Sequence, residues 1–401
     1  MNLPNLRQHV QILATLAATE DVVISCYVNL EAGRAGYRDA LDGRIRAVRT
    51  ALPVRQRRAF EEALGRVEAF LASGLDPAAV GAAIFSRGGD FPVFLPVQFK
   101  VPVSNQMTVD SLPSVFELVL LKDVFHRYVL MISTETHARI VEVSLGDVTS
   151  EIWLRRPELR KRVGREWTRE HYQNHRRGRA EKFIKEKIEI LERLVTDGKY
   201  DHLVLAGSAP AVAKARAKLP KRLLDKLIDI VPIPGATSTE EAVLATLASF
   251  AEHEQQESIE AASLLLDELR RDSLAVAGTA AVLEVLGRGQ VDLLIIAETY
   301  VSPEGWICHR CQSAAVGTLP AACPGCGERS VCEVDFKEEL VRRAEQSGCP
   351  SRQRCASRDW RRRRFASVSD PRGAAWSKRA AAPRKWETAF IIRITLIALL
   401  L

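Results

Sequence analysis

The chain has 401 residues, of which 47% are hydrophobic and 27% are charged. This composition is typical of a globular protein with two or three domains and excludes a disordered or fibrous chain. The net charge of +7 is uneven, because residues 350–401 hold 13 basic and 3 acidic residues, whereas residues 1–349 hold 44 and 47. Residues 155–187 form a further block of 13 basic and 5 acidic side chains, which indicates a local contact with a polyanion.

Residues 1–125 are predicted to form an α/β domain. Helices are indicated by apolar residues at three- and four-residue spacing, and strands by runs of β-branched and apolar residues. The predicted elements are an initial helix, a strand over residues 21–30, helices over 44–51 and 56–72 separated by Pro53, and strands over 81–87 and 91–99.

Residues 126–251 are predicted to form a second domain, which opens with three short strands in a meander. The basic block follows and runs into a helix over residues 180–195. We expect Phe183, Ile188 and Leu191 on its apolar face, with Ile184 and Leu194, and its lysines off that face. Strands over 202–208 and 227–233 then alternate with helices over 210–218 and 239–250, which predicts a partly parallel sheet.

Residues 252–349 are predicted to form a third α/β domain, with mixed sheets flanked by helices as in the other two. Its predicted elements are helices over 255–271 and 279–286, a strand over 291–297, and a zinc ribbon inserted over 302–332. Residues 350–401 form a basic tail without usable periodicity, which we interpret as frameshifted. The alternative is a disordered RNA-binding tail.

Four cysteines form two pairs, Cys308-x2-Cys311 and Cys323-x2-Cys326, separated by eleven residues. Two such pairs set four thiolates in a tetrahedron, the geometry that zinc prefers. A site with four thiolates is closed to a catalytic water, so we predict structural zinc in a reducing compartment. No initial stretch reads as a secretion signal, and residues 390–401 are apolar but too short to span a bilayer. We therefore expect a cytoplasmic protein without membrane association.

The stretch REHYQNHRRGRAEKF, residues 169–183, raises three alternatives: a catalytic loop, a metal site or an RNA grip. Arginines offer forked donors to phosphate, and histidine and tyrosine rings stack on unpaired bases. The candidate RNA-binding residues are Arg169, His171, Tyr172, His175, Arg176, Arg177 and Arg179. A histidine metal site is disfavoured because neighbouring arginines repel a cation, and a solvated charged loop is the other alternative.

The order of the three domains, the HLVLAGS strand (residues 202–208), the segment AAVLEVLGRGQVDLLIIAETY (residues 280–300) and the zinc knuckles together resemble archaeal and eukaryotic class I peptide release factors. The resemblance is closer to the bacterial branch of that family. In the family, a Gly-Gly-Gln loop before a long helix positions water against the peptidyl-tRNA ester. Here HYQ stands in its place, so the resemblance implies Gln173 as the catalytic residue while both glycines are replaced. The stop-codon-reading Asn-Ile-Lys-Ser loop has no match in the first domain.

We predict a ribosome-binding translation factor that acts on stalled or idle ribosomes through contacts with ribosomal RNA at the tRNA site, without decoding stop codons. One alternative is an enzyme, a release or rescue factor that hydrolyses peptidyl-tRNA with Gln173. Another is a zinc-stabilised protein-interaction module. The sequence leaves open whether a translational GTPase is a partner.

Overall fold

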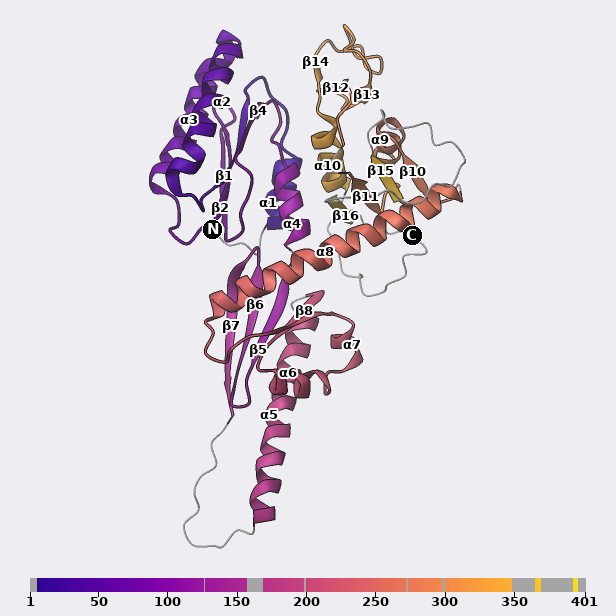
Figure 1. The fold of residues 1–401 in the computed structure, drawn as a ribbon. Helices are drawn as coiled ribbons and strands as arrows, with labels where there is room; N and C mark the ends of the chain where they lie inside the picture. The colour runs from indigo at the N-terminus through magenta and orange to yellow at the C-terminus, as the bar shows by residue number, and fades with distance from the viewer. Residues whose placement is uncertain are drawn as a thin grey trace. The chain divides into compact units, whose positions relative to one another are not determined.

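The computed structural model describes residues 6–125, 127–156, 169–197, 200–271, 273–297, 300–347, 365–368 and 392–395 (Figure 1). The chain forms two compact units, one of residues 1–123 with 254–401 and one of residues 124–253. Mixed sheets with flanking helices occur in both units, which confirms the predicted α/β class. The division into three domains stays a prediction.

The first unit begins with a four-stranded antiparallel sheet of order β3-β2-β1-β4. Its strands are β1 (Val23–Asn29), β2 (Gly81–Arg87), β3 (Val93–Phe99) and β4 (Gln106–Asp110). The helices of this region are α1 (Leu6–Ala14), α2 (Gly33–Ala51), α3 (Val54–Ser73) and α4 (Phe116–Val124). Helices α2 and α3 share one apolar core with β1 and β2, and Pro53 separates them as predicted.

The same unit contains a second sheet, of order β10-β15-β11-β16. Its elements are β10 (Ala275–Ala277), α9 (Thr279–Gly287), β11 (Leu293–Ile296), β15 (Phe365–Val368) and β16 (Ile392–Thr395). The last two strands lie in the segment that we expected to be irregular. Each is only four residues long, too short for sequence periodicity to reveal, and pairing with β11 supplies its partner.

A three-stranded ribbon carries the cysteine pairs. It consists of β12 (Gly305–Cys308), β13 (Ala314–Val316) and β14 (Val331–Glu333), and helix α10 (Phe336–Ser347) follows. Helix α10 joins the two ends of the unit, because the Glu338 carboxylate accepts hydrogen bonds from the backbone N–H groups of Val115 and Phe116 at the start of α4. Burial raises the pKa of Glu338 to about 7.

The second unit is built on a five-stranded sheet of order β7-β6-β5-β8-β9. Its strands are β5 (Tyr128–Ser133), β6 (His137–Ser144), β7 (Asp147–Arg155), β8 (His202–Gly207) and β9 (Leu227–Pro232). Strands β5, β8 and β9 are parallel, and β5, β6 and β7 form the predicted meander. The β6–β7 turn falls at Leu145 and Gly146, which both have positive φ.

Four helices belong to or enter this unit. They are α5 (Arg169–Asp197), α6 (Ala209–Arg216), α7 (Lys221–Leu224) and α8 (Thr239–Arg270). Helix α5 shares a core with one side of the sheet, and the first part of α8 shares a core with the other. The sequence predicts two helices here, over residues 239–250 and 255–271, whereas α8 is a single helix. It is continuous because residues 251–254 contain neither proline nor glycine to end it. No helix in the described part of the chain is long and apolar enough to cross a membrane.

Candidate RNA-binding helix and metal centre

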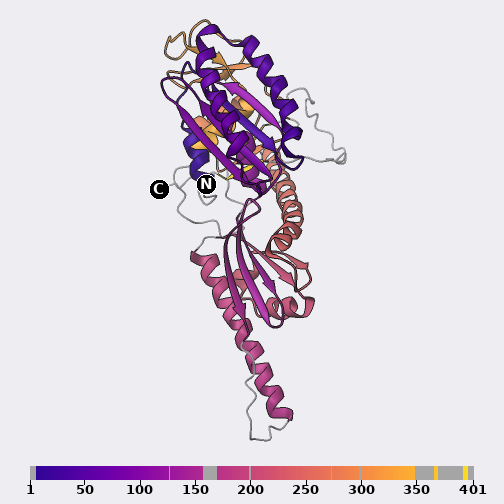
Figure 2. The ribbon, with the colours of Figure 1, turned by 90° about the vertical axis from the view of Figure 1, so that its left-hand side faces the viewer.

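Helix α5 projects beyond the sheet of the second unit (Figures 1 and 2). Its second half carries the buried residues Phe183, Ile188, Leu191 and Val195, which pack on the sheet. The first half has no apolar stripe, and the side chains of Gln173 and Arg177 are exposed. Since apolar contacts cannot hold that half against the sheet, it extends into solvent as a helical arm, residues 169–182.

All the predicted RNA-binding residues lie on this arm, together with Gln173. The stretch is helical rather than the predicted loop before a helix at residue 180. Glutamate, glutamine and arginine favour helix and no proline interrupts the stretch, so the helix continues eleven residues further toward the N-terminus. The helix brings the four arginines within about three turns of one another, which concentrates positive charge on the arm.

Lys187 anchors the base of the arm. Its ammonium donates to Ser133 Oγ at 2.8 Å and lies 4.1 Å from the ring centroid of Phe183. The residue is only 2% exposed, and burial, aided by the charge of Arg156, lowers its pKa to about 8. The prediction that the lysines lie off the apolar face was therefore wrong at this position. Lys187 follows Phe183 by four residues, and this spacing already indicates that both side chains lie on the same face of the helix.

The four predicted metal ligands come together at the ribbon. The sulfur atoms of Cys308, Cys311, Cys323 and Cys326 lie within 4.8 Å of one another. Two cross-knuckle pairs, Cys308–Cys326 and Cys311–Cys323, have sulfur separations of 3.6 and 3.5 Å. Four sulfurs that bind one zinc at about 2.3 Å would stand roughly 3.8 Å apart, so the arrangement fits a tetrahedral metal site.

The two knuckles have matching backbone geometry. The carbonyl of Cys308 accepts a hydrogen bond from the N–H of Gln312, and the carbonyl of Cys323 accepts one from the N–H of Gly327, each at 2.9 Å. Both donors have positive φ, 59° at Gln312 and 73° at Gly327. Glycine adopts this conformation without strain, whereas glutamine needs further support.

Helix α10 provides that support for Gln312. Arg342 donates to its side-chain oxygen at 3.2 Å, and Arg343 donates to its backbone oxygen at 2.6 Å. Both guanidinium groups also bind the carboxylate of Glu339, which is 1% exposed. The first knuckle is thus fixed to α10 by a buried charge network, which agrees with a structural role for the site.

The ionisation of one thiol also suits metal binding. Hydrogen bonding with the side chain and backbone of Ser313 lowers the pKa of the exposed Cys311 thiol to about 6. The thiolate is the form that binds metal. Four thiolates this close together would repel one another, and a bound zinc ion would neutralise that charge.

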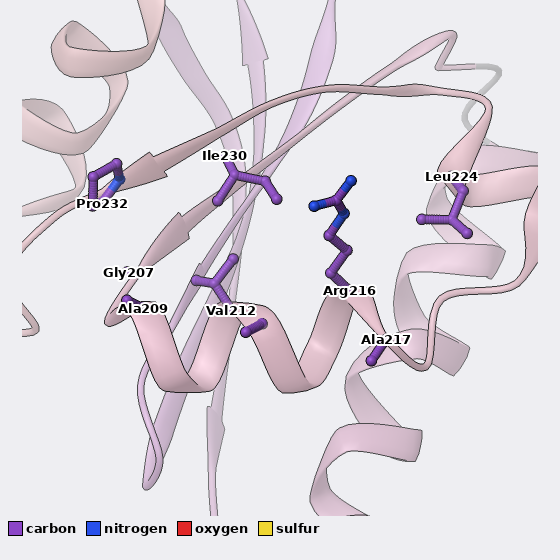
Figure 3. A pocket seen from close by; sticks show the side chains of 9 residues that line it. Gly207, Ala209, Val212, Arg216, Ala217, Leu224, Ile230 and Pro232 are labelled. Atoms are coloured by element: carbon purple, nitrogen blue, oxygen red, sulfur yellow. The ribbon is translucent and has the colours of Figure 1, made fainter.

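A cavity of about 670 Å³ lies beside the turn between β8 and α6 (Figure 3). Its walls are mainly apolar and include Val212, Leu224 and Ile230, with Arg216 as the only ionisable residue of the lining. Gly207 at this turn has a φ of 130°, and a Cβ there would lie 2.0 Å from the backbone oxygen of Ser133. The backbones of Gly207 and Ser133 therefore pack too closely for a side chain at position 207. The residues that line the cavity include no acid and base pair that could catalyse hydrolysis.

Comparison with known proteins identifies the class of the middle segment. Residues 113–252 match the model of Bacterial archaeo-eukaryotic release factor family 10, which is about a third of the chain. The resemblance to the bacterial branch of the archaeal and eukaryotic release factors is confirmed over this segment, which includes the sheet of the second unit and helix α5. A search of curated proteins found no relative of this chain.

Solved structures show weaker likenesses. The archaeal translation termination factor aRF1 is 16% identical over 92% of each chain, with a TM-score of 0.26. Dom34 of S. cerevisiae, a translation termination-like factor of RNA quality control that interacts with Hbs1, is 13% identical over 54% of this chain and 64% of its own, with a TM-score of 0.32. Pelota of Archaeoglobus fulgidus is 12% identical over 74% and 76%, with a TM-score of 0.29. At such TM-scores nothing about the site follows from these likenesses.

Proposed function

We propose that this protein is a ribosome-binding translation factor of the release-factor kind, which acts on stalled or idle ribosomes. The observation that carries the proposal is the arginine-rich arm on helix α5, within the segment that matches the bacterial release factor family. The arm enters the tRNA site and contacts ribosomal RNA there. The site of action is the cytoplasm.

The charge and shape of the arm support an RNA contact. Arg169, Arg176, Arg177 and Arg179 occupy about three turns of a helix that protrudes from the unit. Guanidinium groups bind phosphate through two donors at once, and a projecting helix brings them into a narrow space with little steric conflict. The rings of His171, Tyr172 and His175 add surfaces for stacking on unpaired bases.

The backbone of the arm argues for binding without hydrolysis. Gln173 lies four residues into a regular helix, so its neighbours His171 and Tyr172 have helical φ and ψ. Paired glycines would give the chain freedom to bring a glutamine against the ester in an extended or left-handed conformation, and a helix removes that freedom. Without this approach the side chain does not position water for attack.

We also propose that the four thiolates hold one structural zinc ion. The fit of the sulfur atoms to a tetrahedron supports this assignment. When bound, the metal closes the knuckles and keeps the ribbon folded, with no ligand position left for substrate.

Release of a labelled peptide from stalled ribosomes, with and without a stop codon, tests the absence of hydrolysis. We expect the wild type to leave peptidyl-tRNA at the background rate and Gln173→Ala to behave identically. A rate above background in the wild type that is lost in Gln173→Ala would make the protein a hydrolase and overturn the non-catalytic proposal.

A further inference from the structure

The side chain of Trp153 has 65% of its surface open to solvent. It lies on β7, the edge strand of the five-stranded sheet. An indole has a large apolar surface, and leaving it in water forgoes about 2 kcal/mol of burial free energy. An indole left open to solvent on an edge strand offers a flat apolar face on which a ligand can stack.

The ring is backed by a fixed cation. The guanidinium carbon of Arg139, the residue directly opposite on β6, lies 5.3 Å from the ring centroid of Trp153. Arg139 is only 9% exposed, because its nitrogens donate to Thr239 Oγ1 at 2.9 Å and to the backbone oxygen of Thr237. The hydroxyl of Thr239 donates in turn to Glu151 Oε1 at 2.7 Å. One face of the indole is thus covered by a guanidinium group that a hydrogen-bond network fixes in place.

Further polar and cationic side chains continue the same side of the sheet. Side chains alternate along a strand, so Arg155, two residues after Trp153, lies on the same side. His137 of β6 stands directly opposite Arg155, and both residues are exposed. Two rings and two guanidinium groups therefore occupy four neighbouring positions. The strand ends at Arg155, where the basic block of the sequence begins.

We propose that Trp153 is a stacking platform for an unpaired RNA base, with Arg155 and His137 beside it to contact the sugar-phosphate chain. The inference deepens the proposed function and rests on it, since it adds a second RNA contact in the unit that carries the arm, on the side of the sheet that α8 covers. An aromatic ring among cations suits a nucleotide, which combines a π-face with negative charge. A protein partner would need an apolar surround, whereas Trp153 has Glu151 and Arg155 as its neighbours on this side of β7.

Binding of a fluorescent single-stranded oligoadenylate of about twelve nucleotides, and of a duplex of equal length, tests the platform. Trp153→Ala is expected to weaken binding of the single strand about tenfold, because stacking of one base is worth roughly 1–3 kcal/mol. Trp153→Phe should retain most of the affinity. The slope of affinity against salt should not change, since no phosphate contact is removed.

Leu244→Ala is the matched control, because Leu244 is 62% exposed on α8 and belongs to the same unit. Unchanged single-strand affinity in Trp153→Ala, or an equal loss in Leu244→Ala, would overturn the platform. Equal weakening for single strand and duplex would also overturn it, because paired bases offer no free face.

Ribosome binding by the same variants separates this inference from the proposed function. If the wild type binds ribosomes through the arm and Trp153→Ala binds single-stranded RNA as well as the wild type, only the platform fails. If the wild type binds neither ribosomes nor the oligonucleotide, the proposed function fails with it.

Discussion

At the scale of single residues, the unit that carries the arm contains a charge that its surroundings do not favour. Lys187 is buried beneath the arm against Ser133 and Phe183, and its ammonium contacts the hydroxyl of Ser133, the backbone oxygen of Thr134 and the ring of Phe183. An ammonium in such a place raises the free energy of the folded state. Because Lys187 lies where α5 leaves the sheet, its ionisation affects the stability of the contact between α5 and the sheet.

The depressed pKa of Lys187 has a predictable consequence for stability. Its folded pKa is about 8, whereas 10.5 is its ordinary value, so the unfolded chain binds more protons between these pH values. The free energy of unfolding contributed by this group therefore rises as pH increases from about 8 to about 10.5. Lys187→Met should unfold at a higher temperature than the wild type at pH 7, by about 1–3 kcal/mol in free energy, and the advantage should vanish near pH 10.5.

Thermal unfolding of both proteins across this pH range is the measurement. Lys185→Met is the matched control, because Lys185 is exposed on the same helix and should change stability little at any pH. A stability difference for Lys187→Met that is the same at pH 7 and pH 10.5 would contradict the buried-charge explanation.

At the scale of elements, periodic apolar residues located the strands and helices that pack on a core. The strands β1, β2 and β8 and the helix α3 follow such patterns closely, and the cysteine spacing predicted where the four sulfurs meet. Periodicity could not show the first half of α5, which has no apolar stripe because it contacts no core. It also could not show that α8 is continuous, since that depends on the absence of a helix-breaking residue.

Long-range pairing accounts for the other features that the sequence did not predict. Arg139 and Trp153 are fourteen positions apart and meet only through the register of β6 and β7. The hydrogen bonds that Glu338 accepts from the backbone at the start of α4 join residues more than two hundred positions apart. Neither contact has a local sequence signature, so a single sequence carries no signal for it.

The metal ribbon gives a prediction at this scale. The purified protein should contain about one zinc per chain, and Cys308→Ser or Cys323→Ser should lose the metal. Because Arg342 and Arg343 tie the first knuckle to α10, loss of the metal should also lower the unfolding temperature. Metal analysis and thermal unfolding provide the measurements.

Cys332→Ser is the control for the metal prediction, because Cys332 lies on β14 outside the four-sulfur cluster. It should retain the zinc. Stoichiometric zinc in a variant that lacks all four thiolates of the cluster would show that the ion binds elsewhere.

At the scale of the whole molecule, charge is concentrated where the proposed function needs it. Residues 155–187 carry an excess of eight positive charges by count, although residues 1–349 as a whole are slightly acidic. A basic segment within an otherwise mildly acidic stretch of chain attracts a polyanion to that segment, because the surrounding residues repel it. The family match over residues 113–252 covers the sheet that supports this arm.

Sedimentation with ribosomes through sucrose gradients at increasing salt tests the central claim most directly. The wild type should travel with ribosomal particles, and replacing Arg176, Arg177 and Arg179 with alanine should weaken binding and lower the salt slope by about two to three, since each phosphate contact releases condensed counterions. The same charge change at Arg270, Arg271 and Arg288, which lie outside the arm, should have little effect. A wild type that stays with free proteins at the top of the gradient, or an arm variant that binds like the wild type at every salt concentration, would contradict the account.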